Sequence, residues 1–254
     1  MNLEIALIQT SLIWENPEVN RELFDQKISG IPNHVDMIVL PEMFTTGFTM
    51  TPQQIDHREK KKTLEWMHNW AKEKDTAIVG SIVYPEDGLF TNRLWFVTPE
   101  ETIYYDKKHT FTLAGEDKVY KAGETKLLLE YRGFKICPLV CYDLRFPVWA
   151  RNVEDYDILI YVANWPKPRI MAWDTLLKAR AIENMAYCIG VNRIGVDDFG
   201  HEYPGHSAAY DVLGDPLGFS TTEEILQITL SKSHIEENRK KLRFLEDRDR
   251  FNLI

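Results

Sequence analysis

The chain has 254 residues, with 30 Lys and Arg against 39 Asp and Glu, so its formal net charge is −9. Hydrophobic residues make up 44% and charged residues 27%, proportions typical of a globular protein rather than a disordered or fibrous one. An acidic chain without a strong basic cluster repels phosphate backbones, so nucleic acid is not expected as a partner. No apolar run approaches the roughly 18 residues that a membrane-spanning helix needs, so no membrane association is expected.

The chain contains only three cysteines, Cys137, Cys141 and Cys188. A small and odd number is typical of a reduced protein whose thiols are structural or catalytic. We therefore expect a cytoplasmic location.

Short apolar runs alternate with helical patterns along the chain. Asn16 and Pro17 form an N-cap followed by proline at the first helical position, and Gly30 suits the end of that helix. Helical spacing recurs near residues 64–71 and at 173–188, although 187–192 also has the pattern of a strand. Other strands are predicted at 3–9, 37–40, 77–83, 93–97, 102–106, 134–140, 157–162 and 225–230. This order predicts one layered α/β domain over residues 1–254, with 231–254 as a charged C-terminal tail.

Three reactive side chains directly follow strand-like runs: Glu42, Lys107 and Cys141. In layered α/β folds, sites gather at the carboxyl ends of strands. A thiol must lose its proton to attack, a carboxylate can accept that proton, and an ammonium group can stabilise an oxyanion. Together these residue types predict covalent acyl transfer, with no metal or other cofactor.

Four motifs resemble those of the nitrilase, or carbon–nitrogen hydrolase, superfamily. They comprise 41–44 (PEMF), 105–111 (YDKKHTF), 139–147 (LVCYDLRFP), and 180–187 (RAIENMAY) followed by 192–195 (NRIG). The resemblance extends in order from about residue 3 to residue 230. It implies a four-layer α-β-β-α sandwich, commonly paired through its helices into homodimers or larger assemblies.

The resemblance also implies a role for each site residue. Glu42 would be the general base and acid, and Cys141 the nucleophile. Lys107 would stabilise the oxyanion rather than Lys108, because family members place this lysine two residues before the histidine of the block. The backbone N–H of Tyr142 would be a second oxyanion donor, and Glu116 a supporting carboxylate that orders the site.

Within the superfamily, residues 164–169 (NWPKPR) and the compact length most resemble the bacterial omega-amidases, which cleave the terminal amide of 2-oxoglutaramate and related oxo-acid amides. Such a substrate carries a carboxylate remote from its amide, so a cation is expected in the pocket. Arg169 is the candidate for this cation, and Trp165 and Phe44 are candidates for aromatic walls. Thr110 departs from the leucine usual at its position, which weakens the substrate assignment but leaves the triad intact.

Several alternatives remain open. N-carbamoyl amino acids or aliphatic amides would need the same chemistry, whereas nitriles are less favoured because nitrilases proper usually have longer chains. A non-catalytic binding protein on this fold would be expected to lose one of the three reactive residues. His109 could form a cysteine–histidine dyad, but a role in supporting its loop is favoured.

The remaining polar candidates are expected to be structural. Asp143 and Arg145 flank Cys141 and are expected to form an ion pair, while Cys137 and Cys188 are expected to pack in the core. His201 and His206 would need a further ligand to hold a metal ion, so no metal site is expected there.

Overall fold

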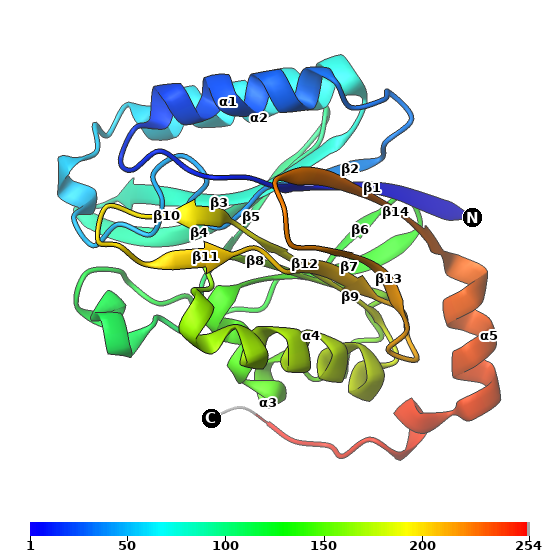
Figure 1. Cartoon of the computed structure of the whole chain (residues 1–254). Helices are drawn as coiled ribbons and strands as arrows, with labels where there is room; N and C mark the ends of the chain where they lie inside the picture. Colours follow the sequence, from blue (N-terminus) through cyan, green and yellow to red (C-terminus); the bar gives the residue numbers. More distant parts are fainter. Residues whose placement is uncertain (253–254) are drawn as a thin grey trace.

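Two six-stranded β-sheets form the centre of the computed structural model, which describes residues 1–252 (Figure 1). The first sheet has the order β14-β1-β2-β3-β4-β5, with β14 (Glu224–Ser231), β1 (Asn2–Gln9), β2 (Met37–Val39), β3 (Ala77–Glu86), β4 (Leu89–Val97) and β5 (Thr102–Asp106). The second has the order β13-β12-β9-β8-β7-β6, with β13 (Pro216–Ser220), β12 (Ser207–Tyr210), β9 (Tyr187–Asn192), β8 (Ile158–Ala163), β7 (Phe134–Val140) and β6 (Leu129–Tyr131). A separate hairpin pairs β10 (Ile194–Val196) with β11 (Glu202–Pro204).

Helices cover the outer faces of both sheets (Figure 1). Two of them, α1 (Pro17–Ser29) and α2 (Glu59–Lys74), lie on the first sheet, while α4 (Ile170–Asn184) packs on β9 and β12 of the second. The short helix α3 (Pro147–Ala150) lies near α4, and α5 (Lys232–Leu242) continues the chain from β14. The order of layers is therefore α-β-β-α, and the predicted fold class is confirmed.

Alternate residues of β1 face the two different cores. Leu3, Ile5 and Leu7 belong to the large cluster between the sheets, whereas Ala6 and Ile8 belong to the cluster beneath α1 and α2. Successive side chains of a strand point to opposite faces, so a strand buried on both faces needs a continuous apolar run. This explains why the run at residues 3–9 predicts a strand without alternating polarity.

The local signals at the ends of α1 are confirmed. The side chain of Asn16 accepts a hydrogen bond from the backbone N–H of Val19, Pro17 is the first helical residue, and Gly30 caps the carboxyl end. For α4 the predicted helical stripe extends too far. The helix ends at Asn184, Met185 adopts a left-handed conformation with φ of 46°, and Cys188 lies inside β9.

The carboxyl ends of several strands meet near one another. In the second sheet β7, β8 and β9 are mutually parallel, and in the first sheet β1, β2 and β3 are parallel. Glu42 follows β2 after a short loop, Lys107 directly follows β5, and Cys141 directly follows β7. The predicted placement of these three residues at strand ends is confirmed.

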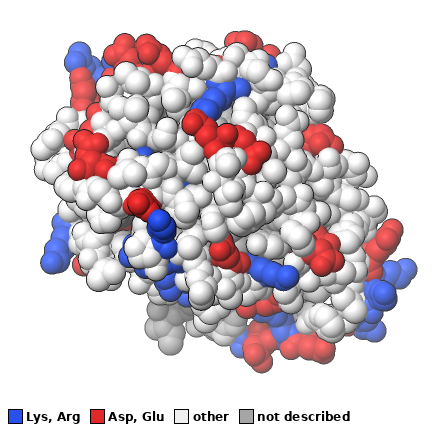
Figure 2. All heavy atoms as spheres, in the orientation of Figure 1, with Lys and Arg blue, Asp and Glu red and all other residues white. Residues whose placement is uncertain are grey.

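The surface gives no sign of a dominant charged patch on the face shown in Figure 2, where acidic and basic side chains are interspersed. Among residues 1–252, none of the helices combines the length and the apolar character needed to cross a membrane.

Candidate active site

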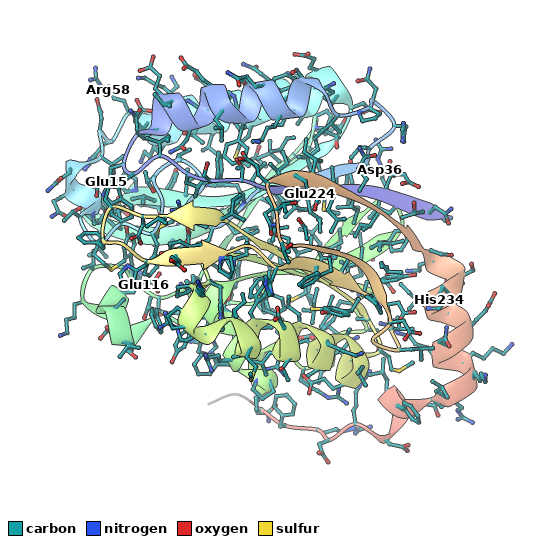
Figure 3. All side chains as sticks on the ribbon, in the orientation of Figure 1. Glu15, Asp36, Arg58, Glu116, Glu224 and His234 are labelled. Atoms are coloured by element: carbon teal, nitrogen blue, oxygen red, sulfur yellow. The ribbon has the colours of Figure 1, made fainter. Side chains whose placement is uncertain are left out.

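Two carboxylates share one ammonium group in the interior. The Nζ atom of Lys107 donates to Oε1 of Glu42 at 2.9 Å and to Oε2 of Glu116 at 2.8 Å. All three side chains are at most 1% exposed, and Figure 3 shows Glu116 within the fold rather than at its rim. Asn92, on β4, donates from Nδ2 to Oε1 of Glu42 at 2.8 Å and to Oε1 of Glu116 at 3.3 Å. The cluster is therefore held by hydrogen bonds that cross between distant parts of the chain.

The charges in this cluster are unevenly balanced. Burial lowers the pKa of Lys107, but the carboxylates of Glu116 and Glu42 outweigh burial and hold that pKa above its usual value. Burial raises the pKa of Glu116, and the negative charge of Glu42 raises it further, while Lys107 acts in the opposite direction. Lys107 is therefore a permanent cation that can stabilise negative charge but cannot accept a proton.

Cys141 occupies a sharp turn at the end of β7. It is the first residue of a 3-10 turn, Cys141–Arg145, and its φ of 43° lies in the left-handed region that non-glycine residues seldom adopt. Burial raises the pKa of its thiol well above the usual value, and Glu42 raises it further by its charge and by a hydrogen bond, while Lys107 lowers it. The resting thiol is consequently neutral, and Glu42 is positioned to accept its proton.

Asp143 and His109 connect the turn of Cys141 to the loop of Lys107. The carboxylate of Asp143 accepts hydrogen bonds from the backbone N–H of His109 at 2.9 Å, from the Tyr105 hydroxyl at 2.8 Å and from the backbone N–H of Val140 at 3.0 Å. Nδ1 of His109 lies 2.7 Å from Asp143 Oδ1, and its ring stacks on Phe146. His109 therefore supports its loop, as the sequence favours.

The expected ion pair between Asp143 and Arg145 is wrong. Asp143 is fully buried and its oxygens are occupied by donors from β5, β7 and the loop of His109. Arg145 instead lies over the ring of Trp165, with the guanidinium carbon 5.1 Å from the ring centroid, and lines the cavity in front of Cys141.

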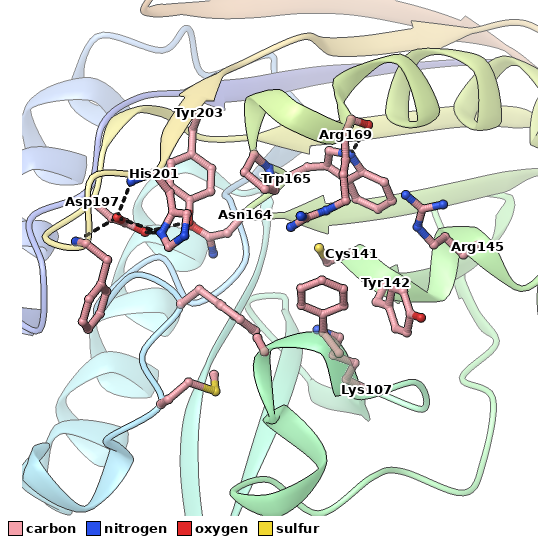
Figure 4. A pocket seen from close by; sticks show the side chains of 16 residues that line it. Lys107, Cys141, Tyr142, Arg145, Asn164, Trp165, Arg169, Asp197, His201 and Tyr203 are labelled. Atoms are coloured by element: carbon pink, nitrogen blue, oxygen red, sulfur yellow. Dashed lines mark hydrogen bonds and ion pairs between the residues drawn. The ribbon is translucent and has the colours of Figure 1, made fainter.

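This cavity has a volume of about 260 Å³ and opens in front of the thiol (Figure 4). Besides Lys107 and Cys141, it is lined by aromatic side chains, namely Phe48, Phe111, Tyr142, Trp165, Phe199 and Tyr203. Two guanidinium groups, those of Arg145 and Arg169, also line it, and within the described part of the chain neither forms an ion pair with an acidic side chain. Figure 4 shows both arginines on the opposite side of the view from Asp197 and His201.

Three predicted pocket residues line this cavity and one does not. Tyr142, Trp165 and Arg169 all line it. Phe44 is fully buried on the helix side of the first sheet, where its ring centroid lies 5.4 Å from that of Phe24. The prediction for Phe44 is wrong because the left-handed turn at Met43 separates the direction of its side chain from that of Glu42.

The sequence reasoning missed several residues of the site. Phe48 lines the cavity in place of Phe44, and Asn164 lines it from the end of β8. The position of Asn164 directly after a strand is the signal that identified Cys141, so the same reasoning could have found it. Asn92 lies within β4, and nothing in its local sequence points to Glu42 or Glu116.

The two histidines considered as metal ligands lie in different environments. Nδ1 of His201 lies 3.2 Å from Asp197, whose other hydrogen-bond donors include the Tyr203 hydroxyl at 2.9 Å. Nδ1 of His206 lies 2.9 Å from Asp174 on α4. In residues 1–252 no three His, Cys, Asp or Glu side chains are grouped so as to hold a metal ion.

Comparison with known proteins identifies the family. Residues 4–240 match the carbon-nitrogen hydrolase family. The chain belongs to this family. It is 42% identical to an omega-amidase, YafV, of Yersinia enterocolitica over 99% of both chains, and 30% identical to a 2-oxoglutaramate amidase of Bacillus subtilis over 97% of this chain and 98% of that one.

A solved structure of the family is also closely similar. The protein XC1258 of Xanthomonas campestris, a CN-hydrolase superfamily protein described with an arsenic adduct in its active site, has a TM-score of 0.96 and 38% identity. The similarity covers 100% of this chain and 99% of that one. The carbon-nitrogen hydrolase fold therefore extends over essentially the whole sequence.

Proposed function

We propose that this carbon-nitrogen hydrolase is an omega-amidase that hydrolyses the terminal amide of small oxo-dicarboxylic acid monoamides, such as 2-oxoglutaramate, to the acid and ammonia. The main support is one cavity that holds a thiol beside a buried carboxylate and ammonium, together with two guanidinium groups that form no ion pair with an acidic side chain of residues 1–252. The omega-amidase and 2-oxoglutaramate amidase names of the relatives agree with this substrate class.

The first half of the reaction forms a thioester. Glu42 accepts the proton of Cys141, and the sulfur attacks the amide carbon. Lys107 Nζ and the backbone N–H of Tyr142 stabilise the negative charge that develops on the amide oxygen. The C–N bond then breaks as Glu42 returns its proton to nitrogen, and ammonia leaves. Moving the proton from the thiol to Glu42 leaves the net charge of the buried cluster unchanged, which limits the electrostatic cost of attack.

The second half of the reaction releases the acid. Glu42, again a carboxylate, takes a proton from a water molecule that attacks the thioester carbon. The C–S bond breaks, and the sulfur recovers a proton from Glu42. Glu116 acts through Lys107, because its two oxygens, at 2.8 and 3.0 Å, fix the ammonium group that must face the oxyanion.

The arginines provide the proposed contact with the substrate carboxylate. A guanidinium group binds a carboxylate through parallel N–H donors, and Arg169 and Arg145 both line the cavity without an acidic partner in the described chain. Arg169 lies over Phe111, at 5.0 Å from the ring centroid, and Trp165 Nε1 donates to the backbone oxygen of Arg169 at 2.7 Å. These contacts hold Arg169 in place while leaving its charged end available.

Three further proposals concern the whole chain. We propose that residues 1–254 form one domain with 231–254 as its C-terminal tail, that the protein is cytoplasmic, and that it is a homodimer or larger homo-oligomer. Exposed apolar side chains on α4, among them Met171 and Ile182, are candidates for the contact between copies. Light scattering of the purified chain measures this last proposal directly, and a monomeric mass at micromolar concentration contradicts it.

A panel of substrates tests the proposed activity. Ammonia release is measured with 2-oxoglutaramate, with an uncharged aliphatic amide of the same length, and with an N-carbamoyl amino acid, all at matched concentrations. We expect kcat/KM to be at least about 100-fold higher for 2-oxoglutaramate than for the uncharged amide, because charge-assisted contacts from the two guanidinium groups contribute on this scale. Equal values for the two amides, or faster release of ammonia and carbon dioxide from the N-carbamoyl compound, would contradict the proposed substrate class.

A further inference from the structure

Asn164 contacts Glu42 twice. Its backbone N–H donates to Glu42 Oε2 at 2.8 Å, and its side-chain Nδ2 donates to the backbone oxygen of Glu42 at 2.6 Å. Asn164 lines the cavity and is only 5% exposed. It therefore stands beside the carboxylate that exchanges protons with the substrate.

The amide oxygen of Asn164 has no hydrogen-bond partner within residues 1–252. The hydrogen bond to Glu42 fixes which atom this is, because exchanging Oδ1 and Nδ2 would place two acceptors 2.6 Å apart. A buried acceptor without a donor is unusual and costs free energy, so it calls for an explanation. Asn164 is nearly as buried as Glu42 and Lys107, which are 0% and 1% exposed. These two residues must contact the substrate in the proposed reaction, so burial of this degree does not prevent Asn164 from contacting it.

We infer that Asn164 Oδ1 accepts a hydrogen bond from the amide nitrogen of the substrate. This inference rests on the proposed amidase function. The nitrogen must lie next to Glu42 to receive its proton, and Asn164 is hydrogen-bonded to that same residue. One N–H directed at Oδ1 turns the nitrogen lone pair toward the carboxylic acid of Glu42. The C–N bond then breaks with its electron pair on nitrogen, the Glu42 proton is transferred to it, and ammonia leaves.

The test compares an amide with an ester of the same acyl group, because an ester leaving group has no N–H to donate. For Asn164→Ala we expect kcat/KM for the amide to fall about 10- to 100-fold more than kcat/KM for the methyl ester, because the nitrogen gains positive charge as Glu42 protonates it and a hydrogen bond to a charged group contributes on this scale. Asn164→Ser is the second variant, because it removes the amide oxygen but keeps a polar hydroxyl on a shorter side chain beside Glu42.

Asn92→Ala is the matched control. Asn92 also donates to Glu42, at 2.8 Å, but does not line the cavity. Weakening Glu42 as a proton donor affects amides more than esters. Asn92→Ala removes hydrogen bonds to Glu42 and Glu116 without removing an acceptor from the cavity, so it measures the effect of disturbing the carboxylates. If the amide-to-ester ratio falls equally in the Asn92 and Asn164 variants, or does not fall in the Asn164 variants, the inference is wrong.

The design separates this inference from the proposed function. If the wild type hydrolyses other amides but not 2-oxoglutaramate, the substrate proposal fails, while the ratio for any accepted amide and its ester still decides the role of Asn164. If the wild type hydrolyses no amide, the amidase proposal and the inference that rests on it are both contradicted.

Discussion

Asp143 and His109 are 34 residues apart, yet they form two direct contacts, through the backbone N–H of His109 at 2.9 Å and through its Nδ1 at 2.7 Å. Each of them lies two residues after a proposed catalytic residue, Cys141 and Lys107 respectively. The pair therefore fixes the distance between the nucleophile turn on one sheet and the lysine loop on the other.

Replacing Asp143 by Asn tests this connection. The variant keeps the size of the side chain but replaces one of its two acceptor oxygens by an NH2 group, so the donors of Tyr105, Val140 and His109 can no longer all be accepted. We expect kcat to fall about 100-fold with little change in KM, the scale associated with a displacement of reacting groups by about 1 Å. Ammonia release gives both constants. Asp174→Asn is the control, since Asp174 also pairs with a histidine, His206, whose Nδ1 lies 2.9 Å away, but does not line the cavity. Equal kcat values in the two variants would contradict the proposed coupling.

The two arginines of the cavity are tested by Arg169→Ala and Arg145→Ala. Each variant should raise KM for 2-oxoglutaramate about 10- to 100-fold, because it removes a charge-assisted contact to the substrate carboxylate. Kinetics with an uncharged amide serve as the control and should change less than about threefold, since no carboxylate is present. An arginine whose loss affects both substrates equally does not bind the carboxylate.

Alkylation by iodoacetamide tests the state of the Cys141 thiol. Burial and Glu42 raise its pKa, so labelling of the wild type should be slow near neutral pH and accelerate as the pH rises. Glu42→Gln removes one of these causes and should lower the thiol pKa. Labelling at neutral pH then becomes faster, about tenfold for each unit by which the pKa falls, while ammonia release is lost.

The other thiols provide the control for this measurement. Cys137 and Cys188 are fully buried, and burial raises the pKa of Cys137 to about 12, so Cys141→Ala should remove the labelling that accelerates with pH. Slower labelling in Glu42→Gln than in the wild type would show that Glu42 does not suppress thiolate formation.

Lys107→Met tests the charge balance of the buried cluster. The variant leaves Glu42 and Glu116 without their shared cation, and it should lower the free energy of unfolding by about 3–5 kcal/mol near pH 8. Lys107 lowers the pKa of Glu116, so its loss raises that folded-state pKa further above the unfolded value. The folded state then binds a proton more readily as the pH falls. The loss of unfolding free energy relative to the wild type should therefore be smaller at about pH 5 than near pH 8.

Lys108→Met is the matched control for this experiment. Lys108 is half-buried and its Nζ lies 5.6 Å from the ring centroid of Trp149, so its loss should cost less than about 1 kcal/mol. Denaturant unfolding at both pH values measures each variant. Equal destabilisation by the two substitutions, or a deficit for Lys107→Met that grows on acidification, would contradict the described cluster.

Much of the fold could be predicted because its signals are local. A continuous apolar run identifies β1, and the cap residues Asn16 and Gly30 mark the ends of α1. The four short strands between residues 194 and 220, β10 to β13, were not predicted. They contain three to five residues each and include Gly195 and Pro204, so neither a long run nor a regular alternation identifies them.

The site residues also divide into those with a local sequence signal and those without one. Lys107 and Cys141 directly follow strands and Glu42 follows β2 after two residues, so their position at strand ends could be predicted, and their catalytic roles remain proposals. Asn92 reaches Glu42 from β4, which pairs with β5. Arg145 lines the cavity because other donors already occupy the carboxylate of Asp143. Both placements follow from three-dimensional contacts that the local sequence does not show. Phe44 shows the limit of proximity in sequence, because one left-handed residue, Met43, sends the two flanking side chains to different layers.

The central proposal is that the sulfur of Cys141 carries the acyl group during turnover. The most direct test is ammonia release from 2-oxoglutaramate by Cys141→Ala, with thermal unfolding measured in parallel to show that the variant is folded. We predict that the folded variant retains less than about 0.1% of the wild-type kcat, since the described residues that line the cavity include no second thiol that could form the thioester. A folded Cys141→Ala protein that keeps more than a trace of ammonia release would contradict the proposed mechanism.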